Sequence, residues 1–192
     1  MTNKTTHKII TVTSGHSNTG KIDSGAVTTV GGKLIKEADM AMLLRNTILY
    51  YLQQDKSITT RCDGYGAVNL ELKEAIKLIE GSDVAVEVHF NSSNNKTANG
   101  VECIALPKDK TLAQNLSKAV AKVTGSRLRG IDGFITQEDS LRGKLGYINA
   151  GGIILEVSFL SNDTELKAFE EKYWLIGKAV AEVLIDYVKN KK

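Results

Sequence analysis

The segment 83–91 (DVAVEVHFN) constrains the fold of this chain more than any other stretch. Valine occupies alternate positions within it, a glycine and a serine precede it, and a loop rich in Asn and Ser follows it. This pattern is typical of a short buried β-strand. His89 lies where such a strand would leave the sheet. In open α/β sheets, ligands bind at the carboxyl ends of the strands. His89 is therefore either a ligand at a functional site or a polar residue that ends a strand.

Strand-like and helix-like segments alternate along the chain. Further short apolar strands are expected at 8–12, 57–61, 101–106 and 152–157. Helices are expected at 33–54, at 70–80 with Asn69 as N-cap, at 110–124, and from 162–163 to the C-terminus. The alternation predicts one α/β domain with a largely parallel sheet, in which residues 126–147 form a loop and one short element.

Composition excludes several classes of protein. The chain has 192 residues, of which 42% are hydrophobic and 24% charged, as in a soluble globular domain. Aromatic residues make up 6% and are scattered, which argues against a stacking platform for nucleic acid. The net charge of +3 identifies no partner. Cys62 and Cys103 are expected to be free thiols in a reducing compartment.

Neither a secretion signal nor a membrane segment is expected. The N-terminal residues 1–8 lack the apolar core of a signal peptide. No apolar run approaches the ~20 residues that a membrane-spanning helix needs.

The loop after the first strand resembles a phosphate loop only in part. Gly15 is followed by Gly20 and Lys21 at the required spacing. The pattern then needs a Ser or Thr to bind magnesium, and this chain has Ile22. A nucleotide-binding site is therefore not expected.

Histidines and acids at strand ends indicate a zinc site instead. His16 follows the first strand and His89 ends a later one, whereas His7 lies in the polar N-terminal tail. Glu37 shares a predicted helix face with Leu34, Ala41, Leu44 and Ile48, so its charge needs a partner or a metal. A first-turn Glu that interacts with the helix dipole explains the same position equally well. Glu156 closes an apolar strand, where it is either the general base and acid of a hydrolase or a salt-bridged strand end.

Five segments occur in the order seen in one enzyme family. They are 14–16 (SGH), 23–26 (DSGA), Glu37, 88–91 (VHFN) and 155–162 (LEVSFLSN). In these segments, which span most of its length, the chain resembles the zinc-dependent N-acetylmuramoyl-L-alanine amidases of the class called amidase 3. The last segment is the most specific of the five.

The resemblance implies a set of roles. It implies that His16, Glu37 and His89 hold Zn²⁺ and that Glu156 is the catalytic acid and base. It also implies a mixed, mostly parallel twisted sheet with helices on both faces. The implied reaction is hydrolysis of the amide between N-acetylmuramic acid and L-alanine in peptidoglycan.

The chain departs from the family pattern at two places. Thr13 and Ser14 stand where the family often has Asp before its first Gly-His pair. Glu87 stands two residues before the second histidine, where a small or hydroxyl residue is frequent, and in a regular strand it shares a face with His89. Glu87 either orients a ligand from the second shell or faces solvent.

Substrate contacts are a further expectation. Asn91 and Arg142 are candidates for substrate binding. Arg127, Arg129 and Arg142 would suit the carboxylates of a stem peptide, with solvated surface arginines as the alternative.

With no export signal and no recognisable wall-binding module, the chain resembles a single-domain phage endolysin. Such a protein is expected to be monomeric, to be made in the host cytoplasm, and to act on the cell wall after a separate protein permeabilises the membrane. A bacterial autolysin or a sporulation amidase fits the same residues. From other classes, a zinc peptidase-like hydrolase of free peptides and a non-catalytic wall-binding domain remain as alternatives.

Overall fold

The computed structural model describes residues 7–18, 22–140 and 142–191. Residues 1–6 of the N-terminal tail, and Gly20 and Lys21 of the phosphate-loop pattern, lie outside the described residues. No described helix combines the length and the apolar character needed to cross a membrane.

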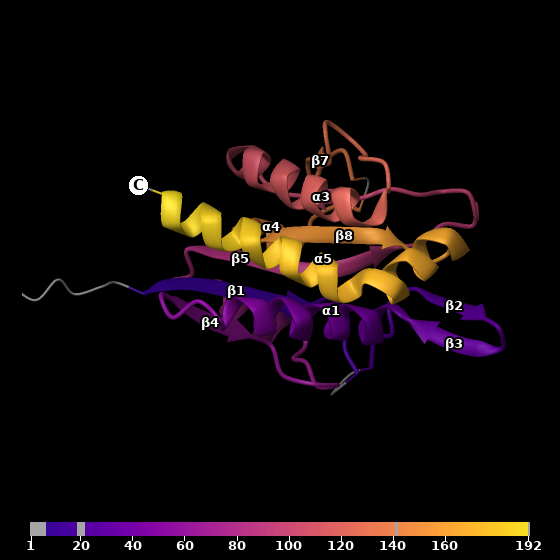
Figure 1. Cartoon of the computed structure of the whole chain (residues 1–192), viewed down its shortest axis with the longest axis horizontal. Coiled ribbons are helices and arrows are strands. Elements are labelled where there is room, and N and C mark those ends of the chain that lie inside the picture. Colours follow the sequence, from indigo (N-terminus) through magenta and orange to yellow (C-terminus); the bar gives the residue numbers. More distant parts are fainter. Residues whose placement is uncertain (1–6, 19–21, 141, 192) are drawn as a thin grey trace, which may run out of the picture.

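A six-stranded sheet forms the centre of the molecule (Figure 1). Its order is β4 (Ile58–Cys62), β1 (Lys8–Ser14), β5 (Val84–Asn91), β8 (Ile153–Phe159), β6 (Glu102–Ile104) and β7 (Phe134–Ile135). The pairs β4–β1, β1–β5, β5–β8 and β6–β7 are parallel, and β6–β8 is antiparallel. The expected mixed, mostly parallel α/β fold is confirmed.

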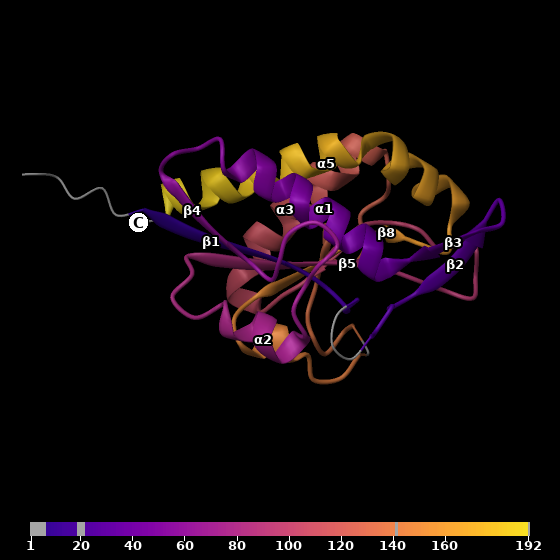
Figure 2. The same cartoon turned by 90° about the horizontal axis from the view of Figure 1, so that it is seen from below.

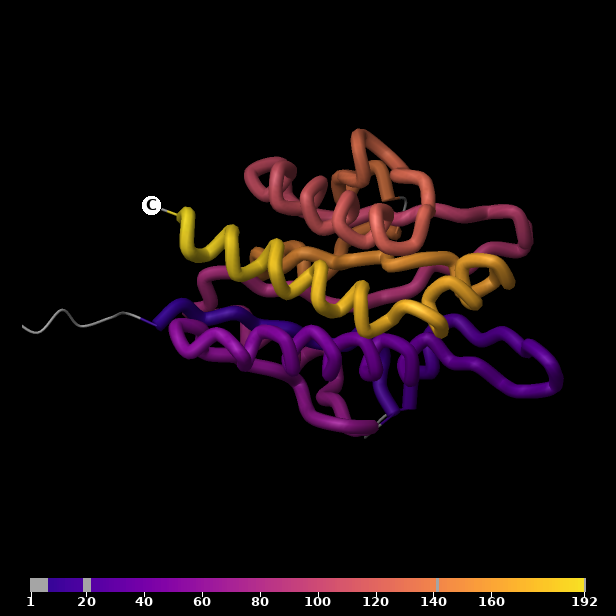
Figure 3. Tube along the Cα trace, in the orientation of Figure 1, coloured from indigo at the N-terminus to yellow at the C-terminus, as the bar shows by residue number. Residues whose placement is uncertain are grey.

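Helices cover both faces of this sheet (Figure 2). One face carries the long helices α1 (Glu37–Leu52), α3 (Lys110–Thr124) and α5 (Asp163–Asn190). The short helices α2 (Leu72–Lys77) and α4 (Gly146–Asn149) lie on the other face, and a 3₁₀ turn, η1 (Pro107–Asp109), leads into α3. The C-terminal end of α5 lies beside the start of β1, where Lys8 and Lys191 both contact Asp83 (Figure 3).

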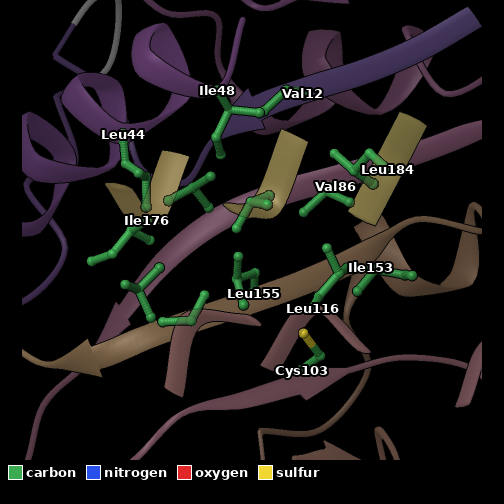
Figure 4. Packing of buried hydrophobic residues seen from close by; sticks show 14 of the residues in the cluster. Val12, Leu44, Ile48, Val86, Cys103, Leu116, Ile153, Leu155, Ile176 and Leu184 are labelled. Atoms are coloured by element: carbon green, nitrogen blue, oxygen red, sulfur yellow. The ribbon is translucent and has the colours of Figure 1, made fainter. Parts of the chain in front are cut away.

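The two faces differ in chemistry because side chains alternate along each strand. Toward the long helices, strand residues such as Val12, Val86 and Leu155 pack against residues such as Ile48 and Leu184 (Figure 4). Toward the short helices, the apolar cluster is small and the carboxyl-end halves of the strands present polar side chains. The functional candidates therefore gather on one face and at one end of the sheet.

One expected helix begins later than its sequence pattern suggested. Residues Lys33–Lys36 form strand β3, which pairs antiparallel with β2 (Val27–Val30), and the helix begins at Glu37. Gly31 and Gly32 adopt positive φ values of 56° and 80°, which a tight hairpin turn requires at both central positions. Leu34 is consequently 56% exposed in the hairpin and does not share a helix face with Glu37.

Other boundaries also differ from expectation. Helix α2 spans only Leu72–Lys77, and its N-cap is Glu71 rather than Asn69. The region 126–147 contains β7 and the start of α4, so it holds two short elements instead of one. Helix α3 matches its expected range, and both cysteines are free.

The N-cap of α5 gives a test of this assignment. The side-chain oxygen of Asn162 accepts hydrogen bonds from the N–H groups of Thr164 (3.0 Å) and Glu165 (3.1 Å), and its amide nitrogen donates to the Ala98 carbonyl (3.1 Å). Asn162→Ala and Asn162→Ser both lose the bond to Ala98, but Ser retains a capping oxygen. Chemical denaturation should show Asn162→Ala to be less stable than Asn162→Ser by about 1 kcal/mol. Equal stability of the two variants would contradict the cap.

Candidate metal centre and active site

Three separate elements bring His16, Glu37 and His89 together. His16 follows β1 with a left-handed backbone (φ 64°), Glu37 is the first residue of α1, and His89 lies near the end of β5. One potential ligand atom from each residue lies within 4.8 Å of the other two. The structure thus assembles the three expected ligands at the carboxyl end of the sheet.

Glu37 is the centre of this cluster. Its Oε2 lies 3.1 Å from His16 Nε2, and its Oε1 lies 3.1 Å from His89 Nδ1. The same two oxygens accept hydrogen bonds from the N–H groups of Ala26 (2.8 Å) and Phe90 (2.9 Å). Glu37 is buried and in the first turn of α1, so the two explanations of its position, contact with the histidines and interaction with the helix dipole, apply together.

In each histidine, the ring nitrogen that does not face Glu37 contacts a second carboxylate. Asp23 Oδ2 lies 3.0 Å from His16 Nδ1, and Glu87 Oε2 lies 3.0 Å from His89 Nε2. Glu87 is buried and shares the strand face of His89, so it does not face solvent. Carboxylates in this position fix the orientation and tautomer of a ligand imidazole. Glu87 thus takes the orienting position of the two that its sequence allows, and no sequence pattern indicated Asp23 as the partner of His16.

The histidines and carboxylates of the cluster shift one another's pKa toward the charged forms. Burial alone would lower the pKa of His89, but its hydrogen bonds to Glu37 and Glu87 hold that pKa well above the usual value. Burial would also lower the pKa of His16, but hydrogen bonds to Glu37 and Asp23 outweigh this effect and raise that pKa. For Glu37, burial favours the neutral acid, yet the two histidines keep its pKa below the usual value. In the metal-free protein the cluster therefore favours imidazolium beside carboxylate.

These shifts predict that the metal-free protein loses stability as the pH rises. A histidine whose pKa is raised by folding contributes stability that is complete below about pH 6.5 and is lost as the pH rises through the folded-state pKa. Thermal unfolding in chelator should therefore show a melting temperature that falls as the pH rises above about 6.5. Glu37→Gln lacks the carboxylate common to both histidines and should flatten this slope. A melting temperature that rises over this range in the chelated wild type would contradict the assignment.

The donor set and its surroundings fit zinc. Two imidazole nitrogens with one carboxylate oxygen form a usual catalytic zinc set, which leaves a position for water. Two glycines leave room for the side chains of this donor set. A Cβ on Gly15 would overlap the imidazole of His89, and a Cβ on Gly25 would overlap His16 and lie 2.6 Å from Glu37 Oε2.

Gly25 offers a matched test of this fit. Gly25 and Gly31 have similar positive φ values, 63° and 56°, but a Cβ on Gly31 would meet nothing within 4 Å. The left-handed backbone should therefore cost Gly25→Ala and Gly31→Ala a similar free energy, about 1–2 kcal/mol. Only Gly25→Ala should lose zinc affinity, measured by competition with a coloured chelator. Wild-type zinc affinity in Gly25→Ala would show that the cluster is not the metal site.

Glu156 lies beside the cluster on the neighbouring strand. It is the register partner of His89 across the β5–β8 pair, and it is completely buried. Arg142 Nη1 lies 2.8 Å from Glu156 Oε1, although neither carboxylate oxygen makes a hydrogen bond of good geometry among the described residues. Burial raises the pKa of Glu156, and the charges of His89 and Arg142 only partly offset this rise.

The candidate substrate-binding residues divide into two groups. Arg142 lines the cleft described below and donates from Nη2 to Asn91 Oδ1 (2.6 Å). Asn91 is buried, and its amide nitrogen donates to Glu102 Oε1 (2.9 Å), so the Asn91 side chain is already bonded on both sides. The other two arginines pair elsewhere, since Arg129 binds Glu102 and Arg127 binds Asn99.

A cleft of about 570 Å³ opens over the cluster. His16, His89 and Glu87 line it. Its lining also includes residues at the start of α2 and around the start of α4, namely Leu70, Leu72, Lys73, Leu145 and Tyr147. Leu70 and Leu72 are 41% and 52% exposed, so the cleft offers apolar side chains together with polar, titratable ones.

Comparison with known proteins identifies the family. Residues 10–186 match the model of the Amidase_3 family, described as N-acetylmuramoyl-L-alanine amidase. The chain therefore belongs to this family. The comparison with curated proteins gave no match.

Solved structures agree with this family. The chain is 44% identical to a provisionally assigned N-acetylmuramoyl-L-alanine amidase from Neisseria meningitidis, with a TM-score of 0.84 and coverage of 96% of this chain and 97% of that one. It is 26% identical to the catalytic domain of the amidase CwlV from Bacillus (Paenibacillus) polymyxa var. colistinus, with a TM-score of 0.79 and coverage of 96% and 99%. An N-acetylmuramoyl-L-alanine amidase from Clostridium difficile 630, at 21% identity, a TM-score of 0.80 and coverage of 97% and 100%, shares the fold.

Proposed function

We propose that this chain is a zinc-dependent peptidoglycan amidase that hydrolyses the bond between N-acetylmuramic acid and L-alanine. The observation that carries the proposal is the approach of His16, Glu37 and His89 in a cleft, with Glu156 paired beside His89 on the next strand. Membership of the amidase family supports the choice of substrate.

His16, Glu37 and His89 would hold the metal, through one ring nitrogen of each histidine and a carboxylate oxygen of Glu37. The chemistry that zinc supplies when bound is Lewis acidity toward a carbonyl oxygen and a water molecule. Asp23 and Glu87 keep the two imidazole rings in place through their outer nitrogens. The ligands are thus oriented before any substrate arrives.

Glu156 handles the proton. Its carboxylate accepts a proton from the attacking water as the new C–O bond forms, and then donates it to the alanine nitrogen as the C–N bond breaks. The products are the lactyl carboxylate of N-acetylmuramic acid and a free α-amino group on L-alanine. The pKa of Glu156, raised by burial, suits a group that must both accept and release a proton near neutral pH.

Arg142 connects Glu156 to the cleft. Its guanidinium pairs with the buried carboxylate while its side chain is 40% exposed among the cleft residues. A substrate carboxylate that attracts Arg142 would free Glu156 for proton transfer. This gives Arg142 the part in substrate binding that the sequence had suggested.

Two substitutions separate metal binding from proton transfer. Glu156→Gln should retain stoichiometric zinc yet lose amidase turnover, because the amide cannot accept the proton from water. His89→Ala should lose both zinc and turnover. Metal analysis before and after chelation, with turnover measured on the same samples, checks both variants. Substantial activity in Glu156→Gln would refute its role, and an active preparation without a stoichiometric divalent metal would end the zinc assignment.

Purified muropeptides test the bond that is cleaved. Digestion followed by identification of the new ends should reveal a free amino group on L-alanine and intact peptide bonds elsewhere. New ends within the stem peptide would instead indicate the peptidase alternative. A wild-type protein that clears no zone in a peptidoglycan gel would indicate a wall-binding domain without catalysis.

Lysis of cells belongs to the same proposal. Cleavage at this amide detaches stem peptides from glycan strands, so a wall that is degraded in this way loses its cross-links. Turbidity of permeabilised bacteria treated with the protein, and sedimentation of the protein alone, test lysis and the expected monomer. An origin in a phage, release from the host cytoplasm and the lack of a wall-binding module stay predictions from the sequence.

A further inference from the structure

A buried group of polar side chains lies beside the His16 loop. It consists of Ser14, Arg45, Asp63 and Asn69, which we call the His16 clamp. We propose that the His16 clamp is a positioning device that holds His16 in its ligand conformation and fixes residues 70–73, which also line the cleft, relative to it. The proposal rests on the metal centre proposed above.

The ion pair of Arg45 and Asp63 is the base of the clamp. Both side chains are 0% exposed, and Arg45 Nη1 lies 3.0 Å from Asp63 Oδ1. Arg45 lies in the buried stripe of α1 among Ala41, Leu44 and Ile48, where an apolar side chain would be usual. Desolvation makes such a pair weak as a source of stability, because well-packed apolar residues often serve as well or better. Its other contacts therefore indicate what the pair does.

Ser14 connects this pair to the end of β1. Asp63 Oδ2 accepts hydrogen bonds from both the N–H (3.2 Å) and the Oγ (3.0 Å) of Ser14. Ser14 Oγ in turn accepts from Arg45 Nη1 (3.2 Å) and Asn69 Nδ2 (3.2 Å). One hydroxyl donor and two lone pairs are thereby all used. The chain is fixed two residues before His16.

Asn69 fixes the chain at His16 and after it. Its Nδ2 donates to the His16 carbonyl (2.6 Å), and its Oδ1 accepts from the Asn18 N–H (3.2 Å). His16 has a φ of 64°, a conformation that a residue with a side chain keeps only when its surroundings enforce it. The contacts of Asn69 with residues 14, 16 and 18 supply that enforcement.

Asn69 also adjoins another part of the cleft lining. It directly precedes Leu70, and Leu70, Leu72 and Lys73 line the cleft together with His16. A single buried amide therefore joins the backbone of a proposed metal ligand to a second segment of the cleft.

The test compares two buried side chains that bond to a backbone carbonyl. Asn69 donates to His16 O at 2.6 Å, and Ser117 donates to Gly133 O at 2.7 Å on the distant helix α3, and both side chains are 0% exposed. Asn69→Ala and Ser117→Ala are prepared in the full chain, freed of metal, and titrated with zinc against a coloured chelator. Thermal unfolding of both metal-free variants is recorded alongside.

Asn69→Ala should bind zinc about 10–100-fold more weakly than wild type, the loss typical when the residues that orient a metal ligand are removed. Ser117→Ala should lower the melting temperature but keep wild-type zinc affinity. Wild-type affinity in Asn69→Ala, or an equal loss in both variants, would overturn the positioning role. If Asn69→Ala does not fold, Ser14→Ala, which removes only the shared hydroxyl, is judged by the same criterion.

The outcomes also separate this inference from the proposed function. A wild-type protein that binds zinc tightly without cleaving muropeptides refutes the amidase proposal and leaves the clamp to be judged by Asn69→Ala. A wild-type protein that binds no zinc refutes both.

Discussion

The end of the sheet that carries the candidate site depends on the contacts of the Glu37 carboxylate. A buried negative charge is costly unless it is paired, and Glu37 meets this requirement with two backbone N–H groups and two imidazoles. Those four contacts come from the loop before β2, from β5 and from the loop after β1. The carboxylate therefore brings three parts of the chain to one point, which is also where a divalent cation would find its ligands.

The asymmetry of the sheet explains why this point is accessible. Apolar side chains on one face are covered by three long helices, which form most of the core. The other face is covered by two short helices, and toward the carboxyl ends of its strands it carries Glu87, His89 and Glu156 in place of apolar residues. Strand alternation thus separates stability from chemistry within the same strands, and reactive groups are buried without interrupting the main core.

The sequence allowed much of this to be predicted, and the misses have physical causes. Residues 83–91 predicted a buried strand because valines alternate along them, and the resemblance of the motifs pointed to the three residues that the structure brings together. The β2–β3 hairpin was missed because Lys33–Lys36 extends the helical pattern of α1, and only the paired glycines indicate a turn. Asn69 was expected to cap a helix, since a local pattern does not reveal a partner that comes from β1. The available signal was Arg45, a charge within an apolar helical stripe.

The strand order has a consequence for the time at which the molecule becomes active. β8 lies between β5 and β6, although it is the last strand in the chain. Until residues 153–159 have been synthesised, β5 has an unpaired edge, which is an aggregation hazard. The residues proposed as metal ligands all precede this strand, whereas Glu156 arrives with it. A ribosome-bound chain would thus carry His16, Glu37 and His89 without Glu156, and the amidase activity proposed for the chain would begin only when the sheet closes.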